Sequence, residues 1–311
     1  MAASERHRPV LLDEALQALA VFDRGIYIDG TFGRGGHSRA ILRLLGDQGR
    51  LIVQDKDPLA VASGREQFGG DGRFSIHQGS FAQMLKVAET EGVVGRVDGI
   101  LLDLGVSSPQ LDDPGRGFSF LKDGRLDMRM DPESGISAAD WVAAAGVEEI
   151  AGVLKDFGEE RFAKRIARAI VRARAEAPIL TTGRLAEIVS GANPAWEKDK
   201  HPATRSFQAI RIYINRELED LRACLDRVLA VLAPGGRLVV ISFHSLEDRM
   251  VKRFMREQSR GDPFPPGLPV THEQLRPGMR VLGKAVRATP EEVRSNPRAR
   301  SAVLRVAERL A

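Results

Sequence analysis

Residues 26–37 read Ile-Tyr-Ile-Asp-Gly-Thr-Phe-Gly-Arg-Gly-Gly-His, a short apolar run followed at once by a glycine-rich loop. A helical segment, Ser38 to Leu45, comes next. Glycines let the chain turn sharply and approach a ligand closely, and the helix that follows presents unpaired backbone N–H groups. This strand, loop and helix predict the start of a parallel α/β sheet, with a ligand bound beyond the end of the strand.

Further apolar runs continue this pattern along the chain. We expect strands at 50–55, 74–77, 97–104 and 237–243, each next to a helical segment. Their apolar residues are nearly continuous, which is typical of strands that helices cover on both faces. The predicted fold class is therefore α/β, a doubly wound Rossmann-like sheet. Near the C-terminus we expect a proline-rich loop at 262–269 and a β-hairpin that joins 284–287 to 302–307.

The alternation of strands and helices breaks between the fourth and fifth strands. About 130 residues separate them, whereas one crossover helix usually needs about 30. The intervening chain predicts helices near 137–145, 147–156, 159–176 and 183–191. We therefore predict an all-helical domain, residues 109–204, inserted into a sheet domain made of residues 1–108 and 205–311. A single amphipathic helix from about Phe207 to Leu232 would lead back to the sheet, and Ala233-Pro234-Gly235-Gly236 would end it.

The composition narrows the class of protein. With 43% hydrophobic and 28% charged residues, the chain reads as an ordinary globular protein. The single cysteine, Cys224, excludes an internal disulfide and a multi-thiolate zinc site. The six histidines show no metal-ligand spacing, so we predict no metal. No apolar run approaches the length of a membrane span, and the first apolar run, Val10 to Leu12, is too short for a signal peptide. We expect no membrane partner and a cytoplasmic location.

The cofactor is predicted from acids at the ends of strands. Asp55 lies 26 residues after Asp29, at the end of the second strand, where a carboxylate can accept hydrogen bonds from ribose hydroxyls. The nearest match to a dinucleotide motif, Gly33-x-Gly35-x-x-Ser38, is incomplete. An acid at the end of strand one suits S-adenosylmethionine, whose ammonium group needs acceptors. We favour that cofactor; a dinucleotide site, or glycines that only shape a turn, are the alternatives.

Several longer stretches are more distinctive. They are His7-Arg8-Pro9-Val10-Leu11, Asp29 to Ser38, Leu101-Leu102-Asp103-Leu104-Gly105-Val106-Ser107-Ser108-Pro109-Gln110, Ser206-Phe207-Gln208-Ala209, Ser242-Phe243-His244-Ser245-Leu246-Glu247-Asp248-Arg249 and Asn296-Pro297-Arg298-Ala299-Arg300-Ser301-Ala302. The order of acids and glycines resembles that of class I methyltransferases. More narrowly, these stretches resemble the bacterial 16S rRNA cytosine-N4 methyltransferase family, in order from residue 7 to the C-terminus.

This resemblance implies an enzyme that transfers a methyl group from S-adenosylmethionine to the N4 amine of a cytidine in the decoding region of 16S rRNA. Its partner would be the small ribosomal subunit, and a homodimer is one assembly that we expect. The cofactor contacts would fall on Gly33, Gly35, Gly36, His37, Asp55, Phe81, Asp103 and Gln110. Taken without the resemblance, Phe81 could equally be a core residue, and His37 could be a residue that starts a helix.

The segment after the fourth strand carries the predicted chemistry. Asp103 ends the strand, and Ser107-Ser108-Pro109-Gln110 resembles the Ser-Pro-Pro-aromatic loop of amino-methylating enzymes, except that Gln110 replaces the aromatic residue and one proline is missing. The cytosine amine is a poor nucleophile, so a site must orient it, accept its N–H groups and take a proton. We predict that Asp103, Ser108 and Pro109 are catalytic, with Asp103 as the general base. The alternative for Asp103 is that it only shapes a turn or caps a helix. We expect the single cysteine, Cys224, to be a packed thiol and not a nucleophile.

Positive charge is unevenly distributed. From Arg249 to the end there are 14 Lys and Arg against 6 Asp and Glu, although the whole chain carries only +4. Arg161, Arg165, Arg168 and Arg172 would also form one stripe on a helix. Such surfaces neutralise phosphates. We therefore predict an RNA-binding role for Arg165, Arg168, Arg172, Arg298 and Arg300; a solvated helix face is the alternative reading of the stripe.

Three questions stay open at this point. His244 could contact the substrate, but we expect it to hydrogen-bond Glu247 or Asp248 and so hold the turn after the fifth strand. A nicotinamide-dependent dehydrogenase could use the same kind of sheet, although the glycine spacing speaks against it. A non-catalytic rRNA-binding assembly factor could keep the fold, although the intact segment from Asp103 to Gln110 argues for an enzyme.

Overall fold

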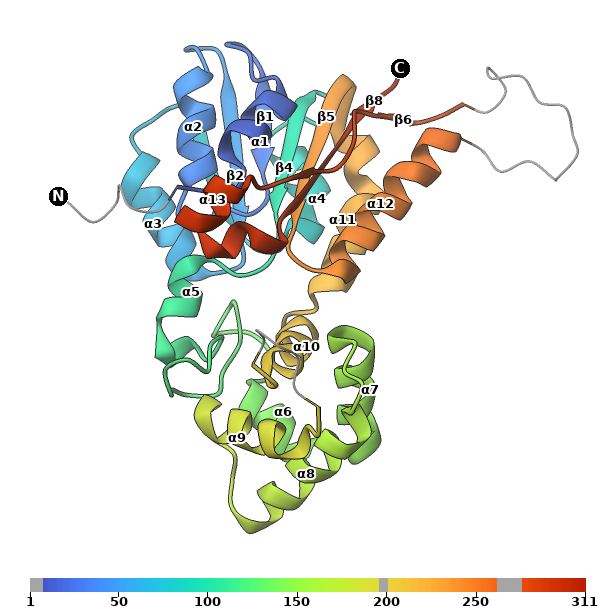
Figure 1. The fold of residues 1–311 in the computed structure, drawn as a ribbon. Helices are drawn as coiled ribbons and strands as arrows, with labels where there is room; N and C mark the ends of the chain where they lie inside the picture. The colour runs from blue at the N-terminus through green and yellow to red at the C-terminus, as the bar shows by residue number, and fades with distance from the viewer. Residues whose placement is uncertain (1–7, 196–200, 262–275) are drawn as a thin grey trace, which may run out of the picture. The chain divides into compact units, whose positions relative to one another are not determined.

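The computed structural model describes residues 8–195, 201–261 and 276–311 (Figure 1). It divides the chain into two compact units, one of residues 1–105 with 218–311 and the other of residues 106–217. We call them the sheet unit and the helical unit. The boundaries predicted from the sequence, 109 and 204, differ from the observed ones mainly at the second, because the helix of residues 204–215 packs within the helical unit. His7 and the loop expected at 262–269 lie outside the described residues.

The sheet unit contains an eight-stranded sheet in which β3-β2-β1-β4-β5-β8-β6 is the order along the main path. The first five strands are parallel, and β8 runs antiparallel to β5. These strands are β1 (Ile26–Asp29), β2 (Arg50–Asp55), β3 (Phe74–Gln78), β4 (Val97–Asp103), β5 (Leu232–Ser242), β6 (Met279–Val281), β7 (Val286–Arg287) and β8 (Val303–Arg309). The predicted doubly wound sheet is therefore confirmed.

Neighbouring residues of each central strand pack into different cores. In β4, Ile100 and Leu102 belong to one buried cluster and Leu101 to the other. This alternation follows from the two-residue period of a strand, and it explains why the strands are apolar on both faces. The helices of the sheet unit are α1 (Leu12–Leu19), α2 (Gly36–Leu44), α3 (Pro58–Phe68), α4 (Met84–Thr90), α11 (Glu217–Val231, whose first residue belongs to the helical unit), α12 (Ser245–Arg260) and α13 (Pro290–Ser295).

The single helix predicted from Phe207 to Leu232 is wrong. The structure has two helices, α10 (Thr204–Asn215) and α11, and the chain turns between them at Arg216, where φ is 51°. The side chains of α10 enter the core of the helical unit, whereas those of α11 enter a core of the sheet unit. The apolar spacing runs on across the break, so the sequence pattern conceals it.

The predicted end of this helix near Leu232 is confirmed, because α11 ends at Val231, but the strand that follows begins earlier than predicted and includes Ala233–Gly236. These residues lie inside β5, where the pairing register with β4 shifts between Val97 and Gly99. The predicted C-terminal hairpin is correct in its pairing, because β7 is antiparallel to β8. It is not a tight hairpin, since α13 and the short 3₁₀ helix Pro297–Ser301 separate the two strands.

The helical unit has its own buried core, which includes Trp141, Leu154 and Ile166. Its helices, apart from a short 3₁₀ helix, are α5 (Ser108–Asp112), α6 (Ala138–Ala144), α7 (Val147–Gly158), α8 (Ala163–Glu176), α9 (Thr182–Ala192) and α10. The helix predicted from 159 begins later because Glu159 adopts a left-handed conformation, with φ 49°. Among the described residues of both units, no helix is long and apolar enough to cross a membrane.

Candidate active site

The glycine loop is tied to the end of β1 through Asp29. This carboxylate is buried and accepts hydrogen bonds from the Ser38 hydroxyl at 2.6 Å and from the Thr31 N–H at 3.1 Å. Burial raises the pKa of Asp29. Both of its oxygens are therefore engaged by the loop and by the first turn of α2, which gives this acid a direct role in shaping the loop.

Asp55 connects the loop to β2. Its two oxygens accept the N–H of Gly33 at 2.7 Å and the N–H of Asp57 at 2.8 Å. Gly33 has φ 55°, a conformation that other residues rarely adopt. Burial raises the pKa of Asp55 to about 6, and the charges of Asp57 and Asp29 act in the same direction. Each oxygen keeps a further lone pair, so the group can accept additional hydrogen bonds.

Gly35 and Gly36 stand where α2 begins. Gly35 has φ 71° and precedes the first helical residue. A Cβ there would overlap the Phe32 ring, and a Cβ on Gly36 would overlap the Pro9 ring. Close packing alone therefore requires glycine at both positions. As in any α-helix, the first backbone N–H groups of α2 have no acceptor within the helix.

Phe81 begins a short 3₁₀ helix after β3 and is half-buried. A Cβ placed on Gly30 would lie 3.1 Å from the Phe81 Cβ, so this aromatic residue is next to the glycine loop. It also packs against one of the two cores of the sheet unit. The core role of Phe81 is therefore confirmed in part, whereas its contact with an adenine ring stays a prediction.

Asp103 ends β4 beside the same loop. Its N–H donates to the Thr31 hydroxyl at 2.7 Å. Its Oδ1 atom is buried without a hydrogen-bond partner among the described residues, although a quarter of the side chain is exposed. Burial raises the pKa of Asp103 well above its usual value, and the charges of Asp29 and Glu247 add to the shift. The site therefore contains a carboxyl oxygen that accepts no hydrogen bond from the residues that the structure describes and that a proton or a donor would stabilise.

His37 lies beside Asp103 and has a defined tautomer. Its Nε2 atom is 3.2 Å from the Val10 carbonyl, so Nε2 carries the hydrogen and Nδ1 is an acceptor. The Nδ1 atom is 3.6 Å from Oδ2 of Asp103. Burial lowers the pKa of His37 to about 4, which leaves the ring neutral at physiological pH. A neutral His37 does not stabilise an ionised Asp103. Its role as a cofactor contact stays a prediction.

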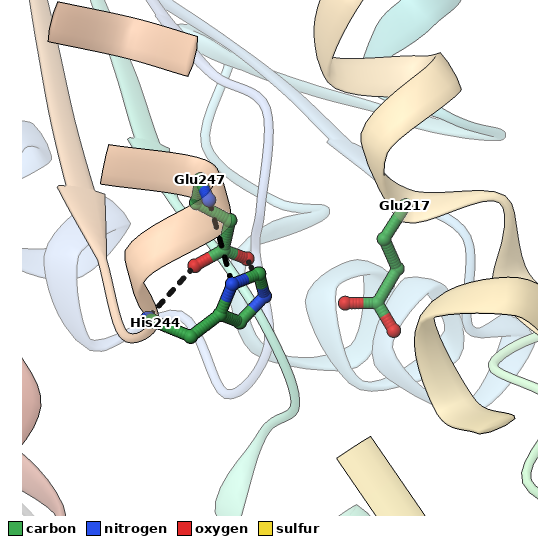
Figure 2. Close-up of side chains that lie close together, drawn as sticks. All are labelled: Glu217, His244 and Glu247. Carbon is green, nitrogen blue, oxygen red and sulfur yellow. Dashed lines mark hydrogen bonds and ion pairs between the residues drawn. The ribbon is translucent and has the colours of Figure 1, made fainter. Parts of the chain in front are cut away.

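His244 caps the helix that follows β5, as expected from the sequence. Its Nδ1 atom accepts the N–H of Glu247 at 3.4 Å (Figure 2). Glu247 in turn accepts the N–H of Phe243 at 2.9 Å. Glu247 is almost fully buried. The expected role of His244 in the turn is confirmed, while a contact with substrate stays untested.

Three of the residues predicted for catalysis or cofactor binding belong to the helical unit. Ser108 and Pro109 open α5, and Gln110 is buried with its Oε1 atom accepting the Ser107 N–H at 2.9 Å. Gln110 thus helps to cap its own helix. The catalytic roles of Ser108 and Pro109 and the cofactor contact of Gln110 stay predictions.

The arginine stripe lies on α8, where Arg165, Arg168 and Arg172 are exposed while Ile166 and Ile170 are buried on the other side. No ion pair of these three arginines is found among the described residues. Arg298 and Arg300 belong to the 3₁₀ helix before β8 in the sheet unit, where Arg300 is exposed. Both groups keep a predicted role in binding RNA.

The sequence did not reveal every residue that shapes the site. Thr31 and Ser38, which hold Asp29, could have been found as hydroxyls close to a buried acid. The effect of the Glu247 charge on the pKa of Asp103 could not have been found, because it depends on the tertiary fold.

Cys224 is buried, and burial raises its thiol pKa to about 12, which confirms that it is a packed thiol.

The chain is similar to several known proteins. The sequence model of the MraW methylase family matches residues 4–310. Ribosomal RNA small subunit methyltransferase H of Thioalkalivibrio sulfidiphilus is 61% identical over 306 residues, which is 98% of each chain. Two solved structures are also similar. One is an rRNA methylase from Streptococcus thermophilus, 10% identical, covering 96% of this chain and 94% of that one, with a TM-score of 0.42. The other is a SAM-dependent methyltransferase from Aquifex aeolicus, 11% identical, covering 99% and 94%, with a TM-score of 0.41.

Proposed function

The chain belongs to the MraW methylase family, and we propose that it transfers a methyl group from S-adenosylmethionine to the N4 amine of a cytidine in the decoding region of 16S rRNA. The family predicted from the sequence motifs is thus confirmed. One observation of the structure carries the proposal for the chemistry: at the end of β4, beside the glycine loop, Asp103 presents a buried oxygen without a donor among the described residues.

The residues of the sheet unit fit S-adenosylmethionine. Asp55 has lone pairs available for ribose hydroxyls, and the N–H groups at the start of α2 can donate to a carboxylate. Phe81 lies against the glycine loop, where an adenine ring would find an apolar neighbour. The unpartnered oxygen of Asp103 suits a ligand that brings N–H or O–H donors. We infer that these four groups, with Gly33, Gly35, Gly36, His37 and Gln110, hold the cofactor.

The bound cofactor supplies an activated methyl group, and the protein must make the amine of cytosine reactive. Asp103 is the group that we assign to this task. Its oxygen accepts a hydrogen bond from the N4 amine, which orients the nitrogen lone pair, and it takes the proton that leaves when the new N–C bond forms. A carboxylate with a raised pKa is a stronger proton acceptor than an exposed one. Ser108 and Pro109 would assist through backbone carbonyls.

We infer that the helical unit recognises the substrate and that the basic residues of α8 contact the RNA. The substrate would be 16S rRNA within the small ribosomal subunit, and the enzyme would act in the cytoplasm, with a homodimer as one assembly to be tested.

The direct test is mass spectrometry of small-subunit RNA after incubation with the protein and S-adenosylmethionine that carries a labelled methyl group. We expect one labelled methyl on the N4 atom of a cytidine in 16S rRNA. Label on a ring carbon, or no label at all, would contradict the proposal. The second outcome would favour a binding factor that has lost catalysis.

Thermal unfolding separates a methyltransferase from a dehydrogenase. At a concentration of about 100 times its Kd, S-adenosylmethionine should stabilise the native protein by about 2.7 kcal/mol. This corresponds to a rise in Tm of about 5–10 °C for a unit of this size. NAD at the same concentration should leave the Tm unchanged. Protection by NAD alone would contradict the cofactor assignment.

Replacing Asp55 by asparagine should improve stability and weaken cofactor binding. The folded-state pKa of about 6 lies above that of an unfolded aspartate, so the stability contributed by this group is present at low pH and lost as the pH rises through 6. At pH 7.5 an amide avoids a buried charge, although its NH2 group loses one of the two backbone hydrogen bonds. We expect a net stabilisation of about 1–2 kcal/mol and an affinity for S-adenosylmethionine about tenfold lower or worse.

Urea unfolding and calorimetric titration at pH 7.5 measure these two effects. A repeat at pH 5 provides the control, since Asp55 is then largely protonated in the wild-type protein and the gain in stability should shrink. A variant that is less stable at pH 7.5 and binds the cofactor normally would contradict the assignment.

A further inference from the structure

Asp220 is a largely buried carboxylate near the start of α11, within the sheet unit. Only 18% of its side chain is exposed. Its Oδ2 atom accepts the Ser80 hydroxyl at 2.6 Å and forms an ion pair with the Nζ atom of Lys56. One oxygen thus contacts two different loops, the loop after β2 and the loop after β3.

The first of these loops follows the acid that is proposed to bind ribose. Lys56 comes directly after Asp55. The two Asp55 oxygens accept N–H groups of the glycine loop and of Asp57, at 2.7 and 2.8 Å. The Lys56 side chain is only 23% exposed. Its ion pair with Asp220 therefore holds the chain at the residue next to Asp55.

The second loop carries the aromatic residue that is proposed to contact adenine. Ser80 comes directly before Phe81, and its hydroxyl oxygen accepts the N–H of Ala82 at 3.1 Å. This contact caps the 3₁₀ helix Phe81–Gln83. The same hydroxyl donates its hydrogen to Asp220. The position of Ser80, which determines where the helix with Phe81 begins, is therefore tied to α11.

Regular pairing between β2 and β3 ends just before these contacts. The pairing register ends with Asp55 and Gln78, and the Gly79 N–H then donates to the Asp55 carbonyl at 2.8 Å. The two residues that contact Asp220 come after this point in each chain segment. Asp220 therefore connects the two loops beyond the end of the regular sheet pairing.

The packing of α11 does not require a charge at this position. Leu221, Cys224 and Leu225 of the same helix are buried in a core of the sheet unit. A carboxylate that is largely removed from water loses hydration, and an ion pair with two largely buried partners contributes little net stability. An apolar side chain would serve packing at least as well. The charge of Asp220 therefore points to a role in orienting the loops that it contacts.

We propose that Asp220 is a positioning residue for the adenosine half of S-adenosylmethionine. It holds Lys56 and Ser80 on one oxygen. It thereby sets the separation between Asp55 and Phe81, the residues assigned to ribose and adenine. The inference rests on the proposed function, because that function assigns these two contacts. Contacts that are already in place bind a ligand more tightly, since less freedom is lost on binding.

Calorimetric titration of the cofactor-free protein tests the positioning role. We expect Asp220→Ala to raise the Kd of S-adenosylmethionine about tenfold, a common effect of losing a charged hydrogen-bond acceptor. The probe 5′-methylthioadenosine has the adenosine half but no carboxylate or ammonium group, and its Kd should rise by the same factor. Wild-type Kd values for folded Asp220→Ala would overturn the inference, and so would a loss confined to S-adenosylmethionine.

A double-mutant cycle shows whether Asp220 acts through Phe81. Phe81→Ala alone should raise the Kd about tenfold, because contacts between a base and an aromatic ring commonly contribute this much. In the Phe81→Ala background, Asp220→Ala should raise the Kd less than about threefold, since the contact that it positions is already gone. A role of Asp220 in stability alone predicts the same factor in both backgrounds. Additive effects, or a normal Kd for Phe81→Ala, would overturn the inference.

Two further variants complete the comparison. Asp226→Ala makes the same change at an exposed position of α11 and should bind both ligands as the wild-type protein does. Ser80→Ala removes the contact with the second loop, leaves the ion pair between Lys56 and Asp220, and should raise both Kd values about fivefold. If Asp220→Ala does not fold, Ser80→Ala decides the question, and normal binding by it would overturn the inference.

Kinetics separate positioning from general damage to the site. The KM of Asp220→Ala for S-adenosylmethionine should rise about tenfold while its kcat changes less than about threefold. A fall in kcat with an unchanged KM would contradict a role in cofactor binding.

Failure of this inference and failure of the proposed function are distinguishable. If the wild-type protein methylates cytidine and folded Asp220→Ala binds both ligands normally, only the positioning role is wrong. If the wild-type protein binds S-adenosylmethionine but transfers no methyl group, while Asp220→Ala loses affinity and is coupled to Phe81, the proposed function fails and the positioning role stands. If neither ligand binds to the wild-type protein, both are wrong.

Discussion

Replacing Asp103 by asparagine is expected to slow methyl transfer by about a hundredfold or more, since removal of a general base commonly costs a factor of this size. An amide still accepts a hydrogen bond but does not take up the proton that the cytosine amine loses. The fold should persist, because a neutral side chain relieves the burial of charge that raises the pKa of Asp103. Single-turnover measurement of labelled methyl transfer, with cofactor and RNA at saturation, isolates this step.

The rate of methyl transfer should also be measured as a function of pH, and with a matched control variant. Asp103 accepts a proton only when ionised, so the wild-type rate should rise with pH through its raised pKa, and the variant should lack this dependence. Asp98→Asn makes the same chemical change near the other end of β4, where Asp98 accepts the N–H of Ile26, and should turn over normally. Near-normal turnover by folded Asp103→Asn would exclude the general-base role.

Replacing Arg165, Arg168 and Arg172 together by glutamine is expected to weaken rRNA binding about a hundredfold at 0.1 M salt. Each phosphate contact contributes about 0.7–0.9 to the slope of log K against log salt, so loss of three contacts should reduce that slope by about two. The three side chains are exposed on α8 and glutamine is a good helix former, so the fold should not change. Fluorescence anisotropy over a range of salt concentrations measures the slope.

The control removes three charges elsewhere. Arg24, Arg43 and Arg65 are exposed in the sheet unit, so their replacement by glutamine gives the same change in net charge. We expect this control to keep nearly the wild-type slope. Equal slopes for the α8 variant and the wild-type protein would mean that the stripe is only a solvated helix face.

Much of the sheet and part of the site could be predicted because the signals are local. Five apolar runs marked the parallel strands, and Asp55 and Asp103 were placed at strand ends by their position directly after such runs. Strand ends of a parallel sheet meet at one edge, so residues far apart in sequence were expected near one another. The contacts of Gly33 with Asp55 and of Asp103 with Thr31 agree with that expectation.

Features that depend on tertiary packing could not be predicted. Arg216 is not a helix-breaking residue, and only the division of α10 and α11 between two cores explains the turn there. Asp103 is made basic partly by the charge of Glu247, which arrives from the helix after β5. The need for glycine at Gly36 comes from the ring of Pro9, a neighbour that no loop motif reveals.

The separate core of the helical unit has an evolutionary consequence. Its buried side chains, such as Trp141 and Ile166, belong to a cluster that shares no residue with the clusters on either side of the sheet. A substitution that repacks one core therefore leaves the other largely unaffected, as expected for sites without shared partners. We therefore expect that lineages can change the surface proposed to bind RNA without disturbing the residues proposed to hold the methyl donor, so that selection acts on the two almost independently.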